Sequence, residues 1–302
     1  MNHFRSLMKL TFVLLSVCAL FVIKAEADEH DEKARKMLDA TGVKGGLIVH
    51  LGCGDGRLTK ALRVSDSFIV HGLDHDAANV AKARAHIRGA GIYGPISVER
   101  FAGRVLPYTD RLVNLLIAED LGDVPMKEVM RVLVPSGVAY IKQGGQWDKI
   151  INPRPAEMDE WTHYLHDPSG NAVSQDQYIS FLRQMQWMGG PRYGRHHDHM
   201  SSASAMVSAG GRLFYIFDHG SPLSIQLPSK WQLVARDAFN GAILWRRDIG
   251  SWYSQMRRLK SGPSDVPRRL VAIDGTVYVT LALDAPVTAL DAATGRAGMP
   301  GD

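Results

Sequence analysis

Apolar positions follow two different periods along the first half of the chain. Short apolar runs, typical of buried parallel strands, are separated by segments whose apolar residues recur at helical spacing. The runs that predict strands cover residues 46–51, 67–74, 96–100, 112–118 and 138–143. The segments that predict helices cover residues 28–40, 55–63, 77–88 and 126–133, and Pro135 and Gly137 are expected to stop the last of them. Strands that alternate with helices predict a doubly wound α/β domain with a parallel sheet.

The pattern changes after residue 145. Residues 146–200 are rich in Trp, His, Asp and Pro without a clear period, which predicts a linker. From residue 201 to 302, short runs of β-forming residues are separated by Asn-Gly and Asp-Gly turns, which predicts an all-β region. This region contains the pattern Ala-x-Asp-Ala-x-x-Gly twice, at residues 235–241 and 289–295. A repeat at an interval of 54 residues is typical of propeller blades.

The first 27 residues have the three-part pattern of a secretory signal. Arg5 and Lys9 supply positive charge, residues 10–23 are almost all apolar, and residues 25–27 read Ala-Glu-Ala, a small-x-small cleavage site. The apolar run is shorter than the about 20 residues that a membrane span needs. We therefore expect a cleaved signal peptide over residues 1–27, with an uncleaved anchor as the alternative. The prediction is an exported bacterial protein, periplasmic or extracellular, with no transmembrane segment beyond the signal.

Composition and charge narrow the class of partner. The chain has 302 residues, of which 45% are hydrophobic and 22% charged, as in ordinary globular proteins. Loss of Arg5, Lys9, Lys24 and Glu26 with the signal lowers the net charge from +4 to +2, which is too mild to predict a nucleic-acid partner. Cys53 would then be the only cysteine, so neither an internal disulfide nor a cysteine-based metal site is expected. The partner is predicted to be an unidentified small molecule or protein.

A glycine-rich turn follows the first predicted strand. Gly52, Gly54 and Gly56 form Gly-x-Gly-x-Gly, and Arg57 stands where a dinucleotide-binding turn has its third glycine. The first glycine permits a tight turn, the second lets the backbone approach a ligand, and the third allows close packing at the helix start. Asp74 ends the second strand, where a carboxylate can accept both ribose hydroxyls of an adenosine. The alternative is a ligand-free turn with a surface acid.

The segments that carry these residues resemble a known family. They read "VHLGCGDGRLTKAL", "VHGLDHDAANVAKAR", "LPYTDRLVNLLIAEDLG" and "EVMRVLVPSGVAYIKQ". Over residues 35–143 they resemble the class I S-adenosylmethionine-dependent methyltransferases. The resemblance implies a Rossmann-like fold with S-adenosylmethionine as cofactor, the glycine turn beside its methionine part, the acid on its ribose and the next residue beside its adenine. The binding residues so implied are Gly52, Cys53, Gly54, Gly56, Asp74 and His75.

Three places depart from the pattern of that family. His50 stands two residues before the first glycine, where the family has an acid, and Asn114 replaces the Asp that begins the fourth strand. Residues 100–108 offer no carboxylate on the adenine side. Lost carboxylates weaken the binding of a ligand that carries a sulfonium and an ammonium. Glu119 and Asp120 are candidates for a general base, with capping of a nearby helix as the alternative, so the catalytic residue stays unassigned.

Histidine and aspartate residues in the second half form another candidate site. The residues that could supply metal ligands are His163, His166, Asp167, His196, His197, Asp198 and His199. Of these, His163 and His166 are expected to share one helix face. The spacing fits no standard ligand pattern, so no metal is predicted, and hydrogen bonds to main chain in a docked linker are the alternative.

The repeated pattern in the all-β region also resembles a known fold. With Trp245 nearby, it is similar to the blade motif of pyrroloquinoline-quinone-type β-propellers. The resemblance implies Gly241 and Gly295 as turn glycines, Asp237 and Asp291 as turn-stabilising acids, and Trp245 as a residue that docks on the neighbouring blade. Two blades cannot close a propeller, which needs about 4–8. An incomplete propeller, within a longer protein, is therefore expected for residues 201–302.

The expected order is a signal peptide, a methyltransferase-like domain over residues 28–145, a linker over residues 146–200 and the repeats. This order resembles large exported proteins of planctomycete bacteria. Three functions stay open: methyl transfer to an unknown acceptor, an exported binding scaffold with a vestigial methyltransferase-like module, and a fragment of a quinoprotein oxidoreductase. Methyl transfer is the favoured function, although S-adenosylmethionine is made in the cytoplasm and the protein is expected to be exported.

Overall fold

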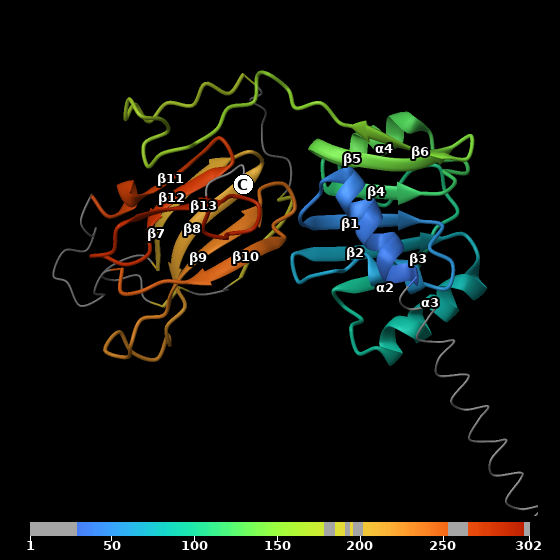
Figure 1. Ribbon diagram of the computed structural model, residues 1–302, viewed down its shortest axis with the longest axis horizontal. Coiled ribbons are helices and arrows are strands. Elements are labelled where there is room, and N and C mark those ends of the chain that lie inside the picture. Colours follow the sequence, from blue (N-terminus) through green and yellow to red (C-terminus); the bar gives the residue numbers. More distant parts are fainter. Residues whose placement is uncertain (1–28, 178–184, 191–193, 196–201, 253–264, 299–302) are drawn as a thin grey trace, which may run out of the picture.

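The computed structural model describes residues 29–177, 185–190, 194–195, 202–252 and 265–298. These residues form two domains side by side, an α/β domain that holds the blue and green elements of Figure 1 and an all-β domain that holds the orange and red ones. The signal peptide expected over residues 1–27 lies outside the described residues. No helix in the described ranges is long and apolar enough to span a bilayer.

A six-stranded sheet organises the first domain, in the order β3-β2-β1-β4-β5-β6. The strands are β1 (Gly46–Leu51), β2 (Phe68–Asp74), β3 (Ile96–Arg100), β4 (Val113–Ala118), β5 (Leu133–Gln143) and β6 (Gln146–Ile151). The first five are parallel, as predicted, and β6 is antiparallel to β5. Gly144 and Gly145, with φ of 56° and 87°, reverse the chain between them. The sheet therefore continues past residue 145 into the segment predicted as a linker.

Helices cover both faces of this sheet. A helix over residues 29–41, α2 (Arg57–Ala61) and α3 (Ala77–Gly89) pack on one face, and α4 (Met126–Val132) packs on the other. The side chains that the first three bury are Ala34, Met37, Leu38, Leu58, Ala61, Val80, Ala83 and Ile87. These side chains recur at helical spacing in the first and third helices, as the predicted helices over residues 28–40 and 77–88 require. The predicted doubly wound fold is confirmed, with a mixed rather than a purely parallel sheet.

The end of α4 differs from the prediction. The helix ends at Val132, and Pro135 and Gly137 lie inside β5 instead of terminating the helix. The strand tolerates Pro135 because its register against β4 shifts between Val113 and Leu115, and proline is accepted at such irregularities. The Ser136 N–H donates to the Asn152 carbonyl of the chain beyond β6 at 2.8 Å, which holds the irregular segment in place.

The second domain consists of two antiparallel sheets that share one core. One sheet has the order β10-β9-β8-β7, and the other has the order β11-β12-β13, preceded by a short 3-10 helix η1 (Pro267–Arg269). The strands are β7 (Ala203–Ala209), β8 (Arg212–Asp218), β9 (Trp231–Asp237), β10 (Ile243–Asp248), β11 (Leu270–Ile273), β12 (Thr276–Thr280) and β13 (Val287–Asp291). Phe214, Trp252 and Val279 are fully buried between the sheets. The all-β prediction is confirmed, and the described residues contain no closed propeller.

The two copies of the repeated pattern form the same turn. Gly241 and Gly295 have φ of 71° and 67°, and their N–H groups donate to the Asp237 and Asp291 carbonyls at 3.0 and 2.8 Å. Each Asp side chain accepts backbone N–H groups of its own turn, at 2.9 Å from Phe239 in the first and 2.7 Å from Thr294 in the second. We call these the first repeat turn (residues 235–241) and the second repeat turn (residues 289–295). The predicted roles of both glycines and both acids are confirmed.

A tryptophan covers each repeat turn. The Trp245 indole packs over Gly295 and donates its N–H to the Ala292 carbonyl at 3.0 Å. The Trp187 indole packs over Gly241 and donates to the Ala238 carbonyl, also at 3.0 Å. The docking role predicted for Trp245 is confirmed, whereas Trp187 was missed because it lies in the segment predicted as a linker. Trp187 precedes its acceptor by 51 residues and Trp245 by 47, so the two contacts are equivalent members of the repeat.

Candidate functional site

A cleft of about 560 Å³ opens at the carboxyl ends of β1, β2 and β4. The strand order reverses at β1, which pairs with β2 on one side and β4 on the other. In open α/β sheets ligands bind in the crevice at this switch point. The polar side chains that line the cleft are Asp74, His75, Glu119, Asp120 and Asp123.

Asp74 links the end of β2 to the glycine turn after β1. Its side chain is 3% exposed, and one carboxylate oxygen accepts the Gly54 N–H at 2.8 Å. The other oxygen accepts the Asp76 N–H at 2.9 Å and the Asn79 side-chain amide at 3.3 Å. The two motifs that the sequence separates by 20 residues are thus joined at one point of the cleft. A carboxylate accepts about four hydrogen bonds, so Asp74 keeps acceptor capacity for a ribose hydroxyl.

The glycines of the turn serve two purposes. Gly52 and Gly54 have φ of 75° and 56°, and a Cβ at either position would meet no atom within 4 Å. They are needed for the left-handed backbone, and they leave open space beside the cleft. Gly56, with φ of 82°, lies against α3, where a Cβ would come within 2.7 Å of the Ala83 Cβ. The predicted packing role of the third glycine is confirmed.

Cys53 and His75 lie at opposite extremes of exposure. The Cys53 side chain is 4% exposed within the core, and burial raises the pKa of its thiol to about 12. Its thiol is therefore kept out of the cleft, and its backbone is bonded within the turn: the N–H donates to the Leu73 carbonyl at 3.1 Å and the carbonyl accepts the Gly56 N–H at 3.0 Å. The His75 side chain is 84% exposed at the rim of the cleft, with Nδ1 3.8 Å from an Asp74 oxygen.

His50, at the place of the family acid, is a neutral core residue. It is 4% exposed, and its Nδ1 shares a hydrogen bond with the Thr59 hydroxyl at 2.8 Å. Burial, with a smaller effect of Lys33, lowers the pKa of its imidazole to about 4. At neutral pH this position therefore supplies the cleft with no negative charge.

The loop after β4 supplies carboxylates in its place. Glu119 accepts a hydrogen bond from the Lys33 ammonium at 2.7 Å, and this contact lowers the pKa of the Glu119 carboxyl. A carboxyl group with a lowered pKa is a weak acceptor of protons. The structure therefore does not support Glu119 as the general base. Asp120 accepts the N–H of Gly122 at 2.8 Å within the loop, and the N-cap residue of α4 is Pro125 without a side-chain cap, so the capping alternative is not confirmed. No sequence signal singled out Lys33, which lies on the exposed side of the helix over residues 29–41.

Asn114 lies far from the cleft, at the amino end of β4. Its carbonyl oxygen accepts the Leu47 N–H at 2.8 Å and the Asn240 amide at 2.7 Å, and its amide donates to Asp237 at 2.6 Å. The first repeat turn is thereby bonded to the α/β sheet. The expectation that Asn114 weakens cofactor binding is wrong, because the side chain serves the domain interface.

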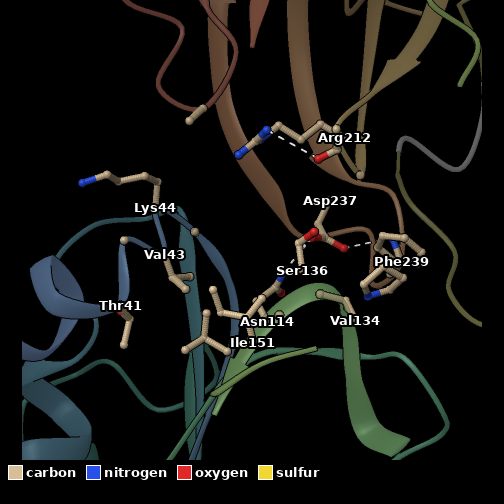
Figure 2. A pocket seen from close by; sticks show the side chains of 18 of the residues that line it. Thr41, Val43, Lys44, Asn114, Val134, Ser136, Ile151, Arg212, Asp237 and Phe239 are labelled. Carbon is tan, nitrogen blue, oxygen red and sulfur yellow. Dashed lines mark hydrogen bonds between the residues drawn. The ribbon is translucent and has the colours of Figure 1, made fainter. Parts of the chain in front are cut away.

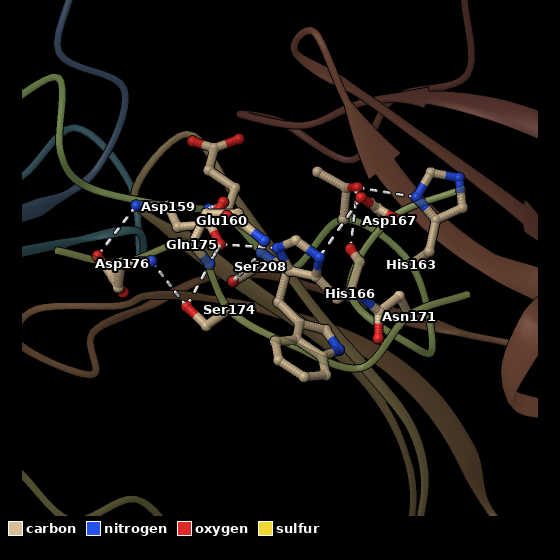
Figure 3. A network of polar contacts seen from close by, with 12 residues as sticks. Asp159, Glu160, His163, His166, Asp167, Asn171, Ser174, Gln175, Asp176 and Ser208 are labelled. Atoms are coloured by element: carbon tan, nitrogen blue, oxygen red, sulfur yellow. Dashed lines mark hydrogen bonds and ion pairs between the residues drawn. The ribbon is translucent and has the colours of Figure 1, made fainter. Parts of the chain in front are cut away.

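The linker histidines belong to a structural network that Figure 3 shows. His166 is buried, and its Nε2 lies 2.7 Å from an Asp159 oxygen, while the His163 Nδ1 shares a hydrogen bond with the Thr162 hydroxyl at 2.8 Å. The expected shared helix face is wrong, because His163 and His166 pair across a tight turn and His166 has a φ of 72°. The Trp161 carbonyl accepts the Ser208 N–H of β7 at 2.7 Å, which docks this segment on the second domain.

No cluster suited to a metal occurs among the described His, Cys, Asp and Glu residues. The candidates His196, His197, Asp198 and His199 lie outside the described residues. The segment with His163 and His166 is docked on the second domain, as the alternative expected, but the two imidazoles bond the side chains of Thr162 and Asp159 and not main chain.

Comparison with known families places the cleft in context. Residues 48–137 match the family model of a methyltransferase domain, a span that includes the glycine turn and Asp74. This part of the chain is similar to methyltransferase domains, and we call it the methyltransferase-like domain. Its candidate cofactor is S-adenosylmethionine, and the acid-lined cleft beside Asp74 fits a ligand with a ribose and two cationic groups.

Several solved structures are similar to the methyltransferase-like domain. One is a protein assigned as an S-adenosyl-L-methionine-dependent methyltransferase from Methanococcus maripaludis, at 21% identity over 37% of this chain and 54% of that chain, with a TM-score of 0.35. Another is the [4+2]-cyclase SpnF, at 21% identity over 37% and 43%, with a TM-score of 0.34. A third is geranyl diphosphate methyltransferase in complex with S-adenosylmethionine, at 24% identity over 37% and 48%, with a TM-score of 0.33.

The chain spans about half the length of these solved structures. A search among curated proteins found no match.

Proposed function

We propose that the methyltransferase-like domain binds S-adenosylmethionine in the cleft and transfers its methyl group to an acceptor that is still to be identified. The observation that carries this proposal is the contact between Asp74 and the Gly54 N–H, at 2.8 Å, inside a cleft lined by four carboxylates. The contact fixes a ribose-binding acid against a turn whose glycines leave room for a ligand. The carboxylates attract the sulfonium and the ammonium of the cofactor.

Methyl transfer requires little from the protein beyond alignment of the acceptor with the methyl group of the cofactor. The bound cofactor supplies an activated methyl group, and the protein positions the acceptor and excludes water. Asp74 would accept a ribose hydroxyl, His75 would flank the adenine, and the backbone of Gly52 and Gly54 would lie beside the methionine part. Asp120 remains as the candidate for receiving a proton from the acceptor, because Lys33 holds Glu119 ionised.

We further propose that the domain is part of a longer exported bacterial protein in which the β sheets complete a propeller. The signal pattern of residues 1–27 supports export. The equivalence of the two repeat turns, each covered by a tryptophan, supports blades of the pyrroloquinoline-quinone type. The bonding of the first repeat turn to Asn114 favours the second candidate function, a binding scaffold in which the methyltransferase-like domain is a structural module. An oxidoreductase would need further blades.

Calorimetric titration of the whole chain with S-adenosylmethionine and with its demethylated product tests the first proposal. We expect both to bind with dissociation constants below millimolar. Asp74→Ala should abolish binding, and His75→Ala should weaken it without changing the melting temperature, since that side chain is 84% exposed. Asp66→Ala, at a side chain that is 96% exposed and outside the cleft, is the matched control.

If the titration shows no heat of binding at millimolar S-adenosylmethionine, the result would favour the second candidate function, a binding scaffold. Binding that survives Asp74→Ala and His75→Ala would mean that the ligand occupies another site. Because Asp74 is buried, circular dichroism of the variant has to confirm that its fold is intact before its binding is interpreted.

A further inference from the structure

A second pocket, of about 400 Å³, lies between the two domains and is separate from the cofactor cleft. We propose that it binds a small organic anion, and that Arg212 recognises the anionic head group. Figure 2 shows Lys44 on the side of the first domain and Arg212 on the side of the second, with Asp237 below Arg212.

The pocket is complete only when both domains are present. The first domain contributes residues 41–45, residues 134–138 of β5, and Lys149 and Ile151 of β6. The second contributes residues 210–212 of the β7–β8 turn and residues from both repeat turns, among them Asp237, Phe239 and Ala293. Sites at domain junctions are a common location for ligand pockets, and the volume lies in the range of about 300–1,000 Å³ that such pockets have.

The lining has an excess of positive charge. Its cations are Lys44, Lys149 and Arg212, and its one carboxylate is that of Asp237. That carboxylate is already engaged by the Asn114 amide at 2.6 Å and by the N–H groups of Phe239 and Asn240 at 2.9 and 3.0 Å. Its hydrogen bonds are therefore directed to the domain interface and its own turn. Its charge still acts on Arg212 without a direct ion pair, and with two lysines beside them the lining keeps a net positive charge.

Arg212 is the group in this pocket that most needs a partner. Its side chain is half-buried, and in the described part of the chain the guanidinium makes one long hydrogen bond, 3.5 Å to the Gly210 carbonyl, and no ion pair. Asp291, which is also close enough to influence it, has one oxygen bonded to the Thr294 N–H and hydroxyl of its own turn. Burial lowers the pKa of Arg212, consistent with a poorly solvated charge. A guanidinium has five donors, and no Arg212 nitrogen is among the described side-chain atoms that are buried without a partner, so its remaining donors are accessible from the pocket, where an oxyanion can accept them.

The remaining lining defines the rest of the ligand. Val43, Val134, Val138, Ile151 and Leu244 give the pocket an apolar wall. A ligand that fits both parts has an oxyanion head and a compact hydrocarbon or aromatic body. The guanidinium fork binds carboxylate and phosphate oxygens in the same bidentate way, so head groups of either kind share this chemistry.

Titration of the whole chain with defined probes tests the proposal. Phenylacetate, indole-3-acetate and phenyl phosphate combine an anionic head with an apolar body, phenylacetamide is the neutral counterpart, and inorganic phosphate is a head without a body. We expect at least one of the first three to bind, and to bind about tenfold or more weakly to Arg212→Gln. Arg247→Gln is the matched control, because Arg247 also donates to a glycine carbonyl, at 3.2 Å, but lies outside the pocket; its affinity should equal that of the unmodified chain.

The melting temperature of Arg212→Gln without ligand distinguishes a role of Arg212 in ligand recognition from a structural role. Arg212 makes one long hydrogen bond and no direct ion pair, so Arg212→Gln should keep a melting temperature close to that of the unmodified chain, and its binding of S-adenosylmethionine should be unchanged. Failure of all three organic anions to bind at millimolar concentration would overturn the proposal. Equal affinity for phenylacetate and phenylacetamide, binding unaffected by Arg212→Gln, or a clear drop in the melting temperature of that variant would also overturn it.

Discussion

His50 and Asp74 are both buried beside the glycine turn, and their partners decide how each affects the cleft. Asp74 receives two backbone N–H groups and one amide, so its carboxylate is held in a fixed direction. His50 has one hydroxyl partner, Thr59, and its remaining surroundings favour the neutral imidazole. The negative charge of the cleft therefore comes from Asp74 and the loop after β4, and none of it comes from the position where the family has an acid.

The neutral state of His50 makes the domain sensitive to acid. The unfolded chain takes up a proton near the ordinary pKa of 6.5, whereas the folded chain does so only at about 4. Stability is therefore lost as the pH falls from 7 toward 4, by about 2 kcal/mol at pH 5 from this residue alone. We expect His50→Gln to show a shallower fall in the free energy of unfolding over this range, measured by urea titration at several pH values.

The control for this experiment is His75→Gln. His75 belongs to the same domain but is 84% exposed, so its replacement controls for the loss of a histidine at the surface. Parallel curves for His50→Gln and the unmodified chain would contradict the prediction.

At the level of elements, the glycine turn determines how closely α2 and α3 can pack. Gly56 precedes the first residue of α2 and touches Ala83 in the middle of α3. A side chain at Gly56 would enter this contact, whereas a side chain at Gly54 would extend into open space. The turn thus has one glycine for packing and others for backbone conformation and ligand access.

Alanine substitutions at these two glycines should separate the effects. Gly54→Ala places a Cβ on a left-handed residue, which costs about 1–2 kcal/mol. Gly56→Ala carries the same cost and adds overpacking against Ala83, worth about 1–3 kcal/mol more. We expect Gly56→Ala to lower the free energy of unfolding by the larger amount, and Gly54→Ala to affect S-adenosylmethionine binding more than stability. An equal loss of stability in the two variants would show that the α2–α3 contact relaxes freely.

At the level of the whole molecule, the first repeat turn is shared between the propeller-like repeat and the domain interface. Asp237 stabilises its own turn with one oxygen and accepts the Asn114 amide with the other. Asn240 of the same turn donates to the Leu112 carbonyl at 2.9 Å, and the Ser67 hydroxyl donates to the Leu244 carbonyl at 2.5 Å. These contacts hold both walls of the inter-domain pocket in place.

Asn114→Asp restores the family's usual residue and should destabilise this chain. The new carboxylate would face Asp237, whose pKa burial already raises, so one of the two would have to be protonated or remain an unpaired buried charge. We expect a loss of about 3 kcal/mol near neutral pH. Since protonation of either acid restores a donor, the loss should shrink as the pH falls toward 5.

The double variant Asn114→Asp with Asp237→Asn exchanges donor and acceptor and is the control. It should recover part of the stability at neutral pH, as measured by thermal unfolding. A loss in Asn114→Asp that does not depend on pH would show that repulsion between carboxylates is not its cause.

Most elements of the α/β domain follow from local pattern. The predicted strands match β1 to β4 within one residue at each end, because each is an apolar run bounded by turn residues. The sequence did not reveal that β5 continues through Pro135 or that β6 reverses on Gly144 and Gly145. Both depend on pairing with a neighbouring strand. The pairing of β5 with β4 shifts register around Pro135, and β6 forms by antiparallel pairing with β5.

The arrangement of the candidate site was also predicted only in part. Asp74 and the glycine turn are found together in the structure because strand order brings the ends of β1 and β2 side by side. The contribution of Lys33 was missed, because an exposed lysine on a helix carries no signal for the residue it pairs with. The metal candidates His163 and His166 instead form a turn, because Asp159 and the edge of β7 bind that segment.

The sequence by itself determined what depends on neighbouring residues: the strands and helices, the left-handed glycines, the acid at the end of β2 and the two repeat turns. The tertiary structure alone decided what depends on contacts between distant residues. Asn114 and Asp237, 123 positions apart, meet at the domain interface, and Trp187 covers Gly241 from within the linker. The physical reason is range: periodicity and turn conformation arise from residues a few positions apart, whereas a hydrogen bond between domains depends on how their surfaces are placed together.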